Sequence, residues 1–585
     1  MVQTKCLAVL FLITVTATWQ QQADAWPHRR QLVSSSTSDL HSLPSLRDEE
    51  GASGRHEMSV GSIPQPQPMP KNTSPTHVTS WKRRLLGEVD IPVYSELLTY
   101  LDAMEQQQPV DCKAAVRNQS RPTPADLGLQ TLDTMQELDT LPARIAFINL
   151  LADQMCSNSS SNSNSSSNGN NSSNSTGNSS SNSTPAGTTR VAMFTMWYGN
   201  LWGLRRSLLP WMQWHLQLGV CRFYLAFQGR DTEAFAALNQ ISPSLLHLIL
   251  FAPPFGSPDA VQKYREAAAT HEWGVRPGNW RMMFKQSHGG DIAFALAREE
   301  GFQWMAHLDV DELLVPETTL AAGLASTPPW VAWLHVLNHE ALVEAEGVVN
   351  KFEEVTLFKT HGSVLPDKAT DLQYRLRLGT HGNNYQLYYN GKAIGRTDKG
   401  PIRMFGVHDF TGPRNAIWKH PQHNPDGEFR AQNASFLLLH LQYSSWTDML
   451  GKARSSCPPE YRAAAAAGNR TKVKECFCLD FDLNAYMAAV QGPQAARELW
   501  LATSLWSEGA VRRDGEKCRV YGNVTQLTSL MLRDGLLKRI TGPRLVLRAH
   551  EIAIRGIARG MGIRVGEGPE KVRVEGRGGE GTVAD

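Results

Sequence analysis

Short apolar runs alternate with segments of helical spacing between residues 189 and 315. Each run has the length of a strand that is buried on both faces, and the four runs are 190–197 (RVAMFTMW), 220–227 (VCRFYLAF), 245–251 (LLHLILF) and 303–308 (QWMAHL). Two segments between them, 207–219 and 290–300, have helical spacing, with Ser207 as a candidate cap for the first. This alternation predicts an α/β fold in which helices flank a mainly parallel sheet. Ligands of such sheets bind at the carboxyl ends of the strands.

The N-terminus carries an apolar segment of another kind. CLAVLFLITVTATW follows Lys5, and the small-residue pattern Ala23-Asp24-Ala25 comes shortly afterwards. The segment is short for a bilayer span, which needs about 20 residues, and has the features of a secretory signal peptide cleaved after Ala25. The alternative is an uncleaved signal anchor, which is the only membrane attachment we expect. Both interpretations send the chain into the secretory pathway.

Composition divides the rest of the chain. Residues 26–93 are rich in Ser, Pro and Gln and predict a disordered stem, because they cannot bury enough apolar surface to offset the entropy of ordering. Residues 157–188 are rich in Ser and Asn, carry several Asn-x-Ser/Thr acceptors for glycosylation, and predict a flexible linker. The expected order is a leader (1–25), a stem (26–93), a small helical region (94–156), a linker (157–188), a catalytic-type domain (189–456), a cysteine-containing extension (457–535) and a basic, glycine-rich tail (536–585).

Charge and cysteine content narrow the partners and the compartment. The formal charge is +2 over 585 residues, which argues against nucleic acid as a partner. We interpret the basic run 544–564 as a solvated helix face or tail, with a membrane or nucleic-acid patch as the alternative. Disulfides among Cys457, Cys476, Cys478 and Cys518 fit an oxidising lumen, and their pairing stays open.

Three carboxylates end the fourth apolar run, in the stretch WMAHLDVDELL (304–314). Asp309 and Asp311 flank Val310, which we expect to continue the strand, so that both acids turn into one crevice at its end. Carboxylates this close raise one another's pKa unless a positive charge neutralises them. Oxygen ligands at this place suit Mg²⁺ or Mn²⁺ bridging to phosphate oxygens. The alternative is an acidic surface turn or a helix N-cap, with Glu312 favouring the helix dipole.

A second Asp-x-Asp pair is Asp480-Phe-Asp482. It follows a cysteine-rich stretch, and no apolar run of strand length precedes it. Because roughly one such pair is expected by chance in a chain of this length, we interpret it as that chance match.

Four stretches follow one another along the chain: RRSLLPWMQWHLQLGVCRFYLAFQ (205–228), HLDVDELL (307–314), GKAIGRTD with VHDF (391–398 and 407–410) and LLLHLQYSSWTDMLGKARSS (437–456). Taken in this order, they resemble glycosyltransferases of the family-2-like and family-92 group. The group shares the GT-A fold, a nucleotide-sugar-binding domain, and the resemblance implies that fold for about 190–456. It also implies a transferase of hexosyltransferase type that moves a sugar from a nucleotide-sugar donor to a glycan or glycoprotein, with inversion.

The resemblance further implies roles for single residues. Asp309 and Asp311 would be the metal-binding pair. Glu312 would be the acid that usually follows this pair in the family, and all three acids would be catalytic residues. His408 would complete the coordination of the cation, and Lys392 would match the family's lysine near the diphosphate.

The downstream stretch adds further candidates. His440 would face the same cleft, with Trp446 and Lys452 following it. Several of these residues also have structural interpretations. His408 could pair with the acid beside it, His440 and Trp446 could belong to the core, and Lys392 could face solvent.

The sequence departs from the family where the nucleobase and ribose would bind. The family usually has an Asn-Glu pair after the first strand, whereas this chain has Asn200 without the Glu. Its second strand ends in Gln228 and Asp231 in place of the usual polar turn. We expect Asn200 and Gln228 at this part of the site, so the donor stays open, with a UDP-sugar among the candidates. Lys285 and Gln286 lie either near the same crevice or on a helix surface.

An inverting transferase needs a carboxylate base near the acceptor. Asp367, Asp398 and Asp409 fall in suitable loops, and the sequence singles out none of them. The resemblance therefore implies a metal-dependent glycosyltransferase that uses Mn²⁺ or Mg²⁺. It would act in the Golgi lumen, free or held by a signal anchor, or as a secreted protein. The alternatives are a non-catalytic secreted glycan-binding module and a metal-dependent phosphate-ester hydrolase, which would need a second metal site with more His and Asp ligands.

Overall fold

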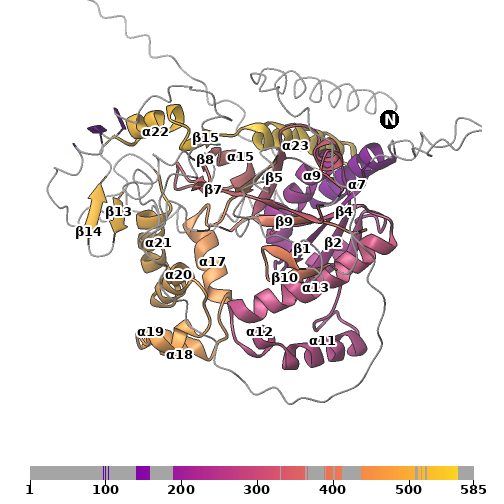
Figure 1. The fold of residues 1–585 in the computed structure, drawn as a ribbon, viewed down its shortest axis with the longest axis horizontal. Helices are drawn as coiled ribbons and strands as arrows, with labels where there is room; N and C mark the ends of the chain where they lie inside the picture. The colour runs from indigo at the N-terminus through magenta and orange to yellow at the C-terminus, as the bar shows by residue number, and fades with distance from the viewer. Residues whose placement is uncertain are drawn as a thin grey trace, which may run out of the picture. The chain divides into compact units, whose positions relative to one another are not determined.

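Figure 1 shows the structure, a computed structural model of the chain. The residues that it describes are 140–157, 189–329, 331–362, 390–398, 402–411, 436–506, 511–514, 517–520 and 523–563, with the single residues 96, 97, 99, 100, 103, 365, 388 and 565. The predicted leader, stem and linker, the far C-terminus and Asp367 lie outside the described residues.

The first sheet contains the four expected strands. They are β1 (Val191–Trp197), β2 (Val220–Phe227), β3 (Leu246–Ile249) and β4 (Trp304–His307). These strands run parallel in the order β3-β2-β1-β4. Beyond β4 the sheet continues with β9 (Lys392–Arg396), which is antiparallel to β4, and then with β6 (Trp333–Val336), which is antiparallel to β9. The prediction of a parallel sheet from buried apolar runs is therefore confirmed for these four strands.

A second sheet, which the sequence did not reveal, is built from strands that alternate along the chain with β6 and β9 of the first sheet. Its order is β15-β8-β7-β12-β5, and of its strand pairs only β7 and β12 run parallel. The strands are β5 (Glu312–Pro316), β7 (Asn338–Leu342), β8 (Leu357–Lys359), β12 (Phe436–His440) and β15 (Leu537–Arg539). The architecture of the described part is thus mixed α/β. The strands of the second sheet are short and far apart in the chain, so local periodicity gives little sign of them.

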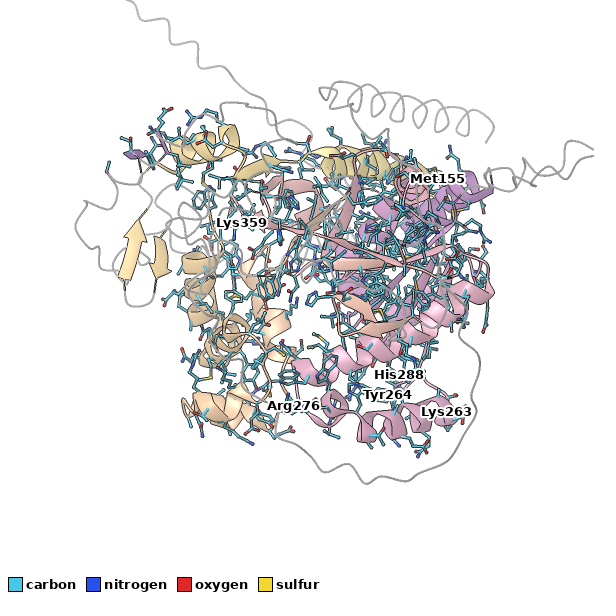
Figure 2. All side chains as sticks on the ribbon, in the orientation of Figure 1. Met155, Lys263, Tyr264, Arg276, His288 and Lys359 are labelled. Carbon is cyan, nitrogen blue, oxygen red and sulfur yellow. A yellow bond between two sulfur atoms is a disulfide. The ribbon has the colours of Figure 1, made fainter. Side chains whose placement is uncertain are left out.

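Helices cover the first sheet. The longest is α13 (Asn279–Glu299), which begins well before the expected 290. It runs through Gly289 and Gly290, two residues of low helix propensity. A Cβ on Gly289 would lie 3.2 Å from Phe194 of β1, and one on Gly290 would lie 2.5 Å from Met404. The two glycines therefore let α13 lie close to the sheet. Tyr264 of α11 (Pro258–Thr270) and His288 of α13 also lie side by side, with ring centroids 5.7 Å apart (Figure 2).

The helix after β1 starts earlier than predicted. It consists of α8 (Leu201–Gly203), a π-helical turn η2 (Leu204–Leu208) and α9 (Leu209–Gln217). Its cap is Asn200, whose Oδ1 accepts the N–H of Gly203 at 3.0 Å. The prediction of Ser207 as the cap is wrong, because that residue lies inside the π-helical turn.

Two helices from opposite ends of the described chain pack on α9. They are α7 (Leu141–Ser157) and α23 (Gly542–Gly560), and Figure 1 shows their labels beside that of α9. Arg144 of α7 pairs with Glu551 of α23 at 2.6 Å. A disulfide between Cys156 and Cys221 ties α7 to β2. The segments expected as a small helical region and as a tail therefore contribute to the main core. In the described residues, no helix is both long and apolar enough for a membrane span.

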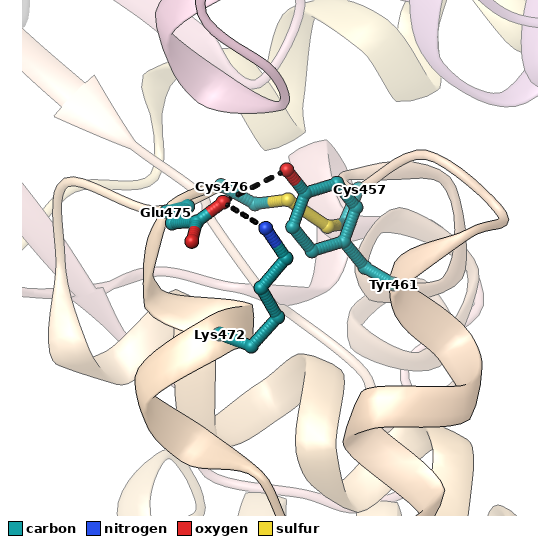
Figure 3. The surroundings of a disulfide bond; sticks show 5 residues. All are labelled: Cys457, Tyr461, Lys472, Glu475 and Cys476. Atoms are coloured by element: carbon teal, nitrogen blue, oxygen red, sulfur yellow. Dashed lines mark hydrogen bonds and ion pairs between the residues drawn. A yellow bond between two sulfur atoms is a disulfide. The ribbon is translucent and has the colours of Figure 1, made fainter.

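Helices α17, α20 and α21 pack together after β12, and α18 and α19 adjoin them. Their bounds are α17 (Trp446–Ser455), α18 (Tyr461–Ala466), α19 (Arg470–Lys474), α20 (Asp480–Gln491) and α21 (Pro493–Thr503). A disulfide joins Cys457 to Cys476. Beside it, Glu475 accepts hydrogen bonds from Tyr461 at 3.1 Å and from Lys472 at 2.7 Å (Figure 3). This bridge lies within the set of four cysteines that the sequence proposed.

The remaining elements are short. They are α10 (Thr232–Leu238), α12 (Glu272–Val275), α14 (Leu320–Ala325), α15 (Lys351–Glu354), α22 (Val524–Arg533), β10 (Arg403–Phe405), β11 (Asp409–Thr411), β13 (Val511–Asp514) and β14 (Lys517–Val520).

Candidate active site

The acidic stretch forms the turn between the two sheets. Strand β4 ends at His307 and β5 begins at Glu312, so Val310 lies in the turn and the prediction that it continues the strand is wrong. The turn is closed from both sides. Glu312 donates its N–H to the carbonyl of Asp309 at 3.0 Å, and the Glu312 carboxyl accepts the N–H of Asp309 at 2.7 Å. Asp309 and Asp311 still lie at the carboxyl end of β4, as expected for a ligand site.

Helix α9 fixes where β5 leaves this turn. The indole N–H groups of Trp211 and Trp214 donate to the carbonyls of Glu312 and Leu314, each at 2.8 Å. His215 Nε2 accepts the N–H of Leu314 at 3.2 Å. Burial lowers the pKa of His215 to about 3, so its ring stays neutral and keeps the lone pair that this bond needs. All three side chains are buried, so the acidic turn has a rigid support.

A buried lysine neutralises the first acid. Lys392, at the start of β9, has no exposed surface, and its Nζ lies 2.7 Å from Asp309 Oδ2 and 2.9 Å from the carbonyl of Val407. Gln286 of α13 donates to Asp309 Oδ1 at 2.6 Å. Burial would raise the pKa of Asp309, but the charge of Lys392 outweighs it and the pKa is lowered. The alternative of a solvent-facing Lys392 is therefore wrong.

Glu312 behaves differently from its two neighbours. Its side chain is 3% exposed, and burial raises its pKa to about 8 although Lys392 Nζ is 3.6 Å from Oε2. At neutral pH this carboxyl is therefore mostly protonated. Three acids in the sequence thus give two negative charges in the folded protein, which removes part of the expected repulsion.

The second acid faces several basic groups. Lys452 of α17 lies 3.3 Å from Asp311 Oδ2, and His440 Nε2 lies 4.0 Å from Oδ1. Burial would raise the pKa of Asp311, but the charges of Lys452, His440 and Lys351 hold it well below its usual range. His440 reaches this place because β12 pairs with β5, with His440 opposite Glu312. Lys351, in α15, was not found from the sequence, where no motif surrounds it.

His408 has the form of a metal ligand. Its Nδ1 lies 2.9 Å from the carbonyl of Gly391, so this nitrogen carries the hydrogen and Nε2 keeps its lone pair. Burial, with the charge of Lys392, lowers its pKa to about 3, and it lies close enough to Asp309 to feel that carboxylate. Yet no three His, Cys, Asp or Glu side chains of the described residues lie together as a metal site. As they stand, the described side chains do not fit a cation site without further ligands.

The residues expected near the donor order the loops at the ends of β1 and β2. Gln228 follows β2 and donates its N–H to the carbonyl of Trp197 at 2.8 Å. Asp231 accepts the N–H of Leu201 at 2.8 Å and caps α10. The Asn200 side chain, as described above, caps α8. Asn200 and Asp231 thus use side-chain oxygens to hold backbone.

A lysine and a tyrosine lie beside these loops. Lys285 of α13 has its Nζ 5.2 Å from the ring centroid of Tyr198, the residue after β1. Burial lowers the pKa of Lys285 to about 8. Lys285 therefore lies near the end of β1, and its place in a ligand-binding crevice stays a prediction.

Three other candidates from the sequence have the following surroundings in the structure. Trp446 is 9% exposed and belongs to the core. Asp398 follows β9. The register of β9 with β4 puts Asp398 near one end of the sheet and Asp309 at the other. Asp409 is buried, and its Oδ1 accepts the N–H of Phe410. None of these contacts identifies a base.

Comparison with known proteins gives two relatives and no family. No model of a known protein family matches the chain. A protein of Arabidopsis thaliana named Glycosyltransferase-like At2g41451 is 26% identical over 354 residues, which cover 59% of this chain and 70% of that protein. A second Arabidopsis protein, Glycosyltransferase-like At3g57200, is 26% identical over 379 residues, covering 63% of this chain and 65% of the relative. The chain is therefore similar to proteins described as glycosyltransferase-like.

Proposed function

We propose that the chain is a glycosyltransferase that takes a sugar from a nucleotide-sugar donor and passes it to a glycan or glycoprotein. The observation that carries the proposal is the pairing of Asp309 and Asp311 with Lys392 and Lys452 at the carboxyl end of β4. Similarity to glycosyltransferase-like proteins supports the same class. The finer version is a hexosyltransferase of the family-2-like and family-92 group with a GT-A fold, acting with inversion in the Golgi lumen.

The diphosphate of the donor would lie against the lysines beside the second acid. Lys452 is 47% exposed and can reach a ligand, and Lys351 lies near the same carboxylate. When the bond between the anomeric carbon and the phosphate breaks, negative charge develops on the departing diphosphate. Cations already in place stabilise that charge without reorganising, which is the electrostatic part of the catalysis. Lys392 has no exposed surface, so its role is to hold Asp309.

A divalent cation belongs to this proposal as a prediction. Mn²⁺ or Mg²⁺, if bound by Asp309, Asp311 and His408, would supply further neutralisation of the diphosphate. The described side chains do not form that site alone, so phosphate oxygens of the donor would have to supply the missing ligands.

The test is nucleotide release by the full chain, purified from a secretory host. Sugar nucleotides, UDP-sugars first, are supplied one at a time with a panel of acceptor glycosides, with and without Mn²⁺. We expect release from one donor, lost in Asp311→Asn. The matched control is Asp259→Asn on α11, an exposed acid that pairs with Lys263, which keeps the wild-type rate. Well-folded protein that neither releases nor binds any nucleotide would instead favour a non-catalytic glycan-binding module.

A further inference from the structure

The Asp-x-Asp pair that was interpreted as a chance match, Asp480-Phe-Asp482, lies beside the candidate site in the structure. Asp482 lies in the first turn of α20, and α20 packs on α17, which carries Lys452. Figure 1 shows these two helices next to one another. The charge of Asp482 acts on Lys452, which also contacts Asp311. One lysine therefore lies within the influence of carboxylates from both Asp-x-Asp pairs.

Three polar side chains from other parts of the chain donate hydrogen bonds to Asp482, and a fourth supports one of them. The hydroxyls of Tyr388 and Tyr443 both donate to its Oδ1 at 2.8 Å, and Asn279 of α13 donates to Oδ2 at 3.2 Å. Gln442 in turn donates to the Tyr388 hydroxyl at 2.7 Å. Burial, with the charge of Asp482, raises the pKa of both tyrosines well above the usual value, so both keep the hydrogen that they donate.

The same tyrosines reach toward the acidic turn. The ring of Tyr388 lies edge-on to His440, with centroids 5.2 Å apart, and His440 is the neighbour of Asp311. Lys452 Nζ lies 5.4 Å from the ring centroid of Tyr443. A continuous set of side chains thus links Asp482 to the acids after β4.

Tyr443 also holds an unusual backbone conformation. Its φ is +54°, and it is the only residue other than glycine with a positive φ in the described part of the chain. Residues other than glycine are strained in this region, and such residues concentrate at functional sites. The residue with this conformation is one of the two tyrosines that donate to Asp482.

We propose that Asp482 is the base that receives the proton of the acceptor hydroxyl. This role rests on the proposed glycosyltransferase function. The acceptor O–H bond breaks, and its proton goes to the carboxylate of Asp482. The oxygen uses the released electron pair to bond to the anomeric carbon. The bond from that carbon to phosphate breaks, and its electron pair leaves on the nucleoside diphosphate near Lys452. Tyr388, Tyr443 and Asn279 are positioning residues, because they orient the carboxylate.

The same turn of helix offers a matched control. Asp480 lies two residues before Asp482, is 50% exposed and pairs with Lys474 at 3.2 Å. Asp480→Asn removes an acid from the same helix start and leaves the network around Asp482 in place. Both variants are compared in the full chain, using the donor and acceptor found in the panel above.

The measurements are kcat, KM for the acceptor, and the dissociation constant of UDP by calorimetry. We expect Asp482→Asn to lower kcat by roughly 10²–10⁴-fold, with UDP affinity unchanged, while Asp480→Asn keeps the wild-type values. Asp482→Glu restores part of the rate. Tyr443→Phe, which removes a single hydroxyl, lowers kcat about tenfold and keeps the inference testable if Asp482→Asn does not fold.

The assignment of Asp482 as the base would be overturned, with the proposed function intact, if Asp482→Asn had the same kcat as Asp480→Asn. It would also be overturned if Asp482→Asn lost UDP affinity to the same extent as it lost rate. Unchanged kcat in Tyr443→Phe would overturn it in the same way. A wild-type chain that binds UDP but turns over no donor would overturn the proposed function, and the role of Asp482 with it.

Discussion

Replacing Lys392 by methionine tests the account of the acidic turn directly. Methionine has a similar length and no charge, so the change removes the ion pair with Asp309 and fills most of the space. Lys392 is fully buried, and its Nζ contacts Asp309 at 2.7 Å and the Val407 carbonyl at 2.9 Å. Removing one partner of a buried pair leaves an uncompensated charge, and typically costs about 3–5 kcal/mol.

The loss of stability expected for Lys392→Met lies near the lower end of that range. Asp309 keeps the hydrogen bond from Gln286 at 2.6 Å, and its side chain is 32% exposed, so water relieves part of the loss. We expect a loss of about 3 kcal/mol in the free energy of unfolding. Lys452→Met is the matched control, because that lysine also contacts an acid of the turn but is 47% exposed. Exposed pairs contribute about 0–1 kcal/mol, so its loss should stay below about 1 kcal/mol.

The assay is urea unfolding of the full chain, followed by tryptophan fluorescence. Urea is uncharged and does not screen ion pairs, as guanidinium would. The double variant Lys392→Met with Asp309→Asn should recover part of the stability, because it removes the orphaned charge as well. Equal losses in Lys392→Met and Lys452→Met, or no recovery in the double variant, would refute the argument that burial makes Lys392 the structural partner.

Three further predictions concern stability, each measured against the wild-type chain. The pKa of Glu312 is raised to about 8 in the folded protein, so its protonated form is favoured by folding; the resulting stability is fully present below about pH 4.5 and is lost as the pH rises to 8. Glu312→Gln should therefore flatten this loss in urea titrations at pH 5, 7 and 9, and parallel curves would contradict it. The Cys457–Cys476 bridge closes a loop with a sequence separation of 19, so Cys457→Ala should lower the free energy of unfolding by about 3 kcal/mol. Reductant should then cause no further loss through this bridge. Gly278 has φ +62°, and a Cβ there would lie 2.4 Å from the Cys476 carbonyl oxygen, so Gly278→Ala should cost about 1–3 kcal/mol, and a change under 0.5 kcal/mol would count against it.

The sequence predicted those parts of the fold that depend on local pattern. Buried parallel strands read as continuous apolar runs, and this located β1 to β4 within a few residues. The start of α13 was misplaced because Gly289 and Gly290 lower helix propensity. Their close approach to the sheet, visible only in three dimensions, explains why the helix continues through them.

The candidate site was predictable to the extent that strand order determines it. Asp309 and Asp311 followed from the rule that ligands bind at strand ends. Lys351 comes from helix α15 and lies outside any motif, whereas Asp482 comes from helix α20 and belongs to the Asp-x-Asp pair that was interpreted as a chance match. The reason for dismissing Asp482 was the lack of a preceding strand. A residue can reach a site equally well from the first turn of a helix that packs over it, and pattern alone does not reveal that packing.

The crowding of acids that first suggested a cation has a different resolution in the folded chain. Glu312 is mostly protonated at neutral pH, and Lys392 and Lys452 each contact one of the other two acids. The turn is therefore close to neutral before any ligand arrives, and repulsion alone does not demand a metal ion. In the proposed function, a nucleoside diphosphate would bring a net negative charge together with phosphate oxygens, which are the ligands that the described side chains lack. A cation that takes some of its ligands from the diphosphate must bind weakly to the chain alone and tightly when UDP is present. Because coupling between two ligands is reciprocal, UDP must in turn bind more tightly when Mn²⁺ is present. Tight binding of Mn²⁺ to the nucleotide-free chain would show instead that the acids form a cation site by themselves.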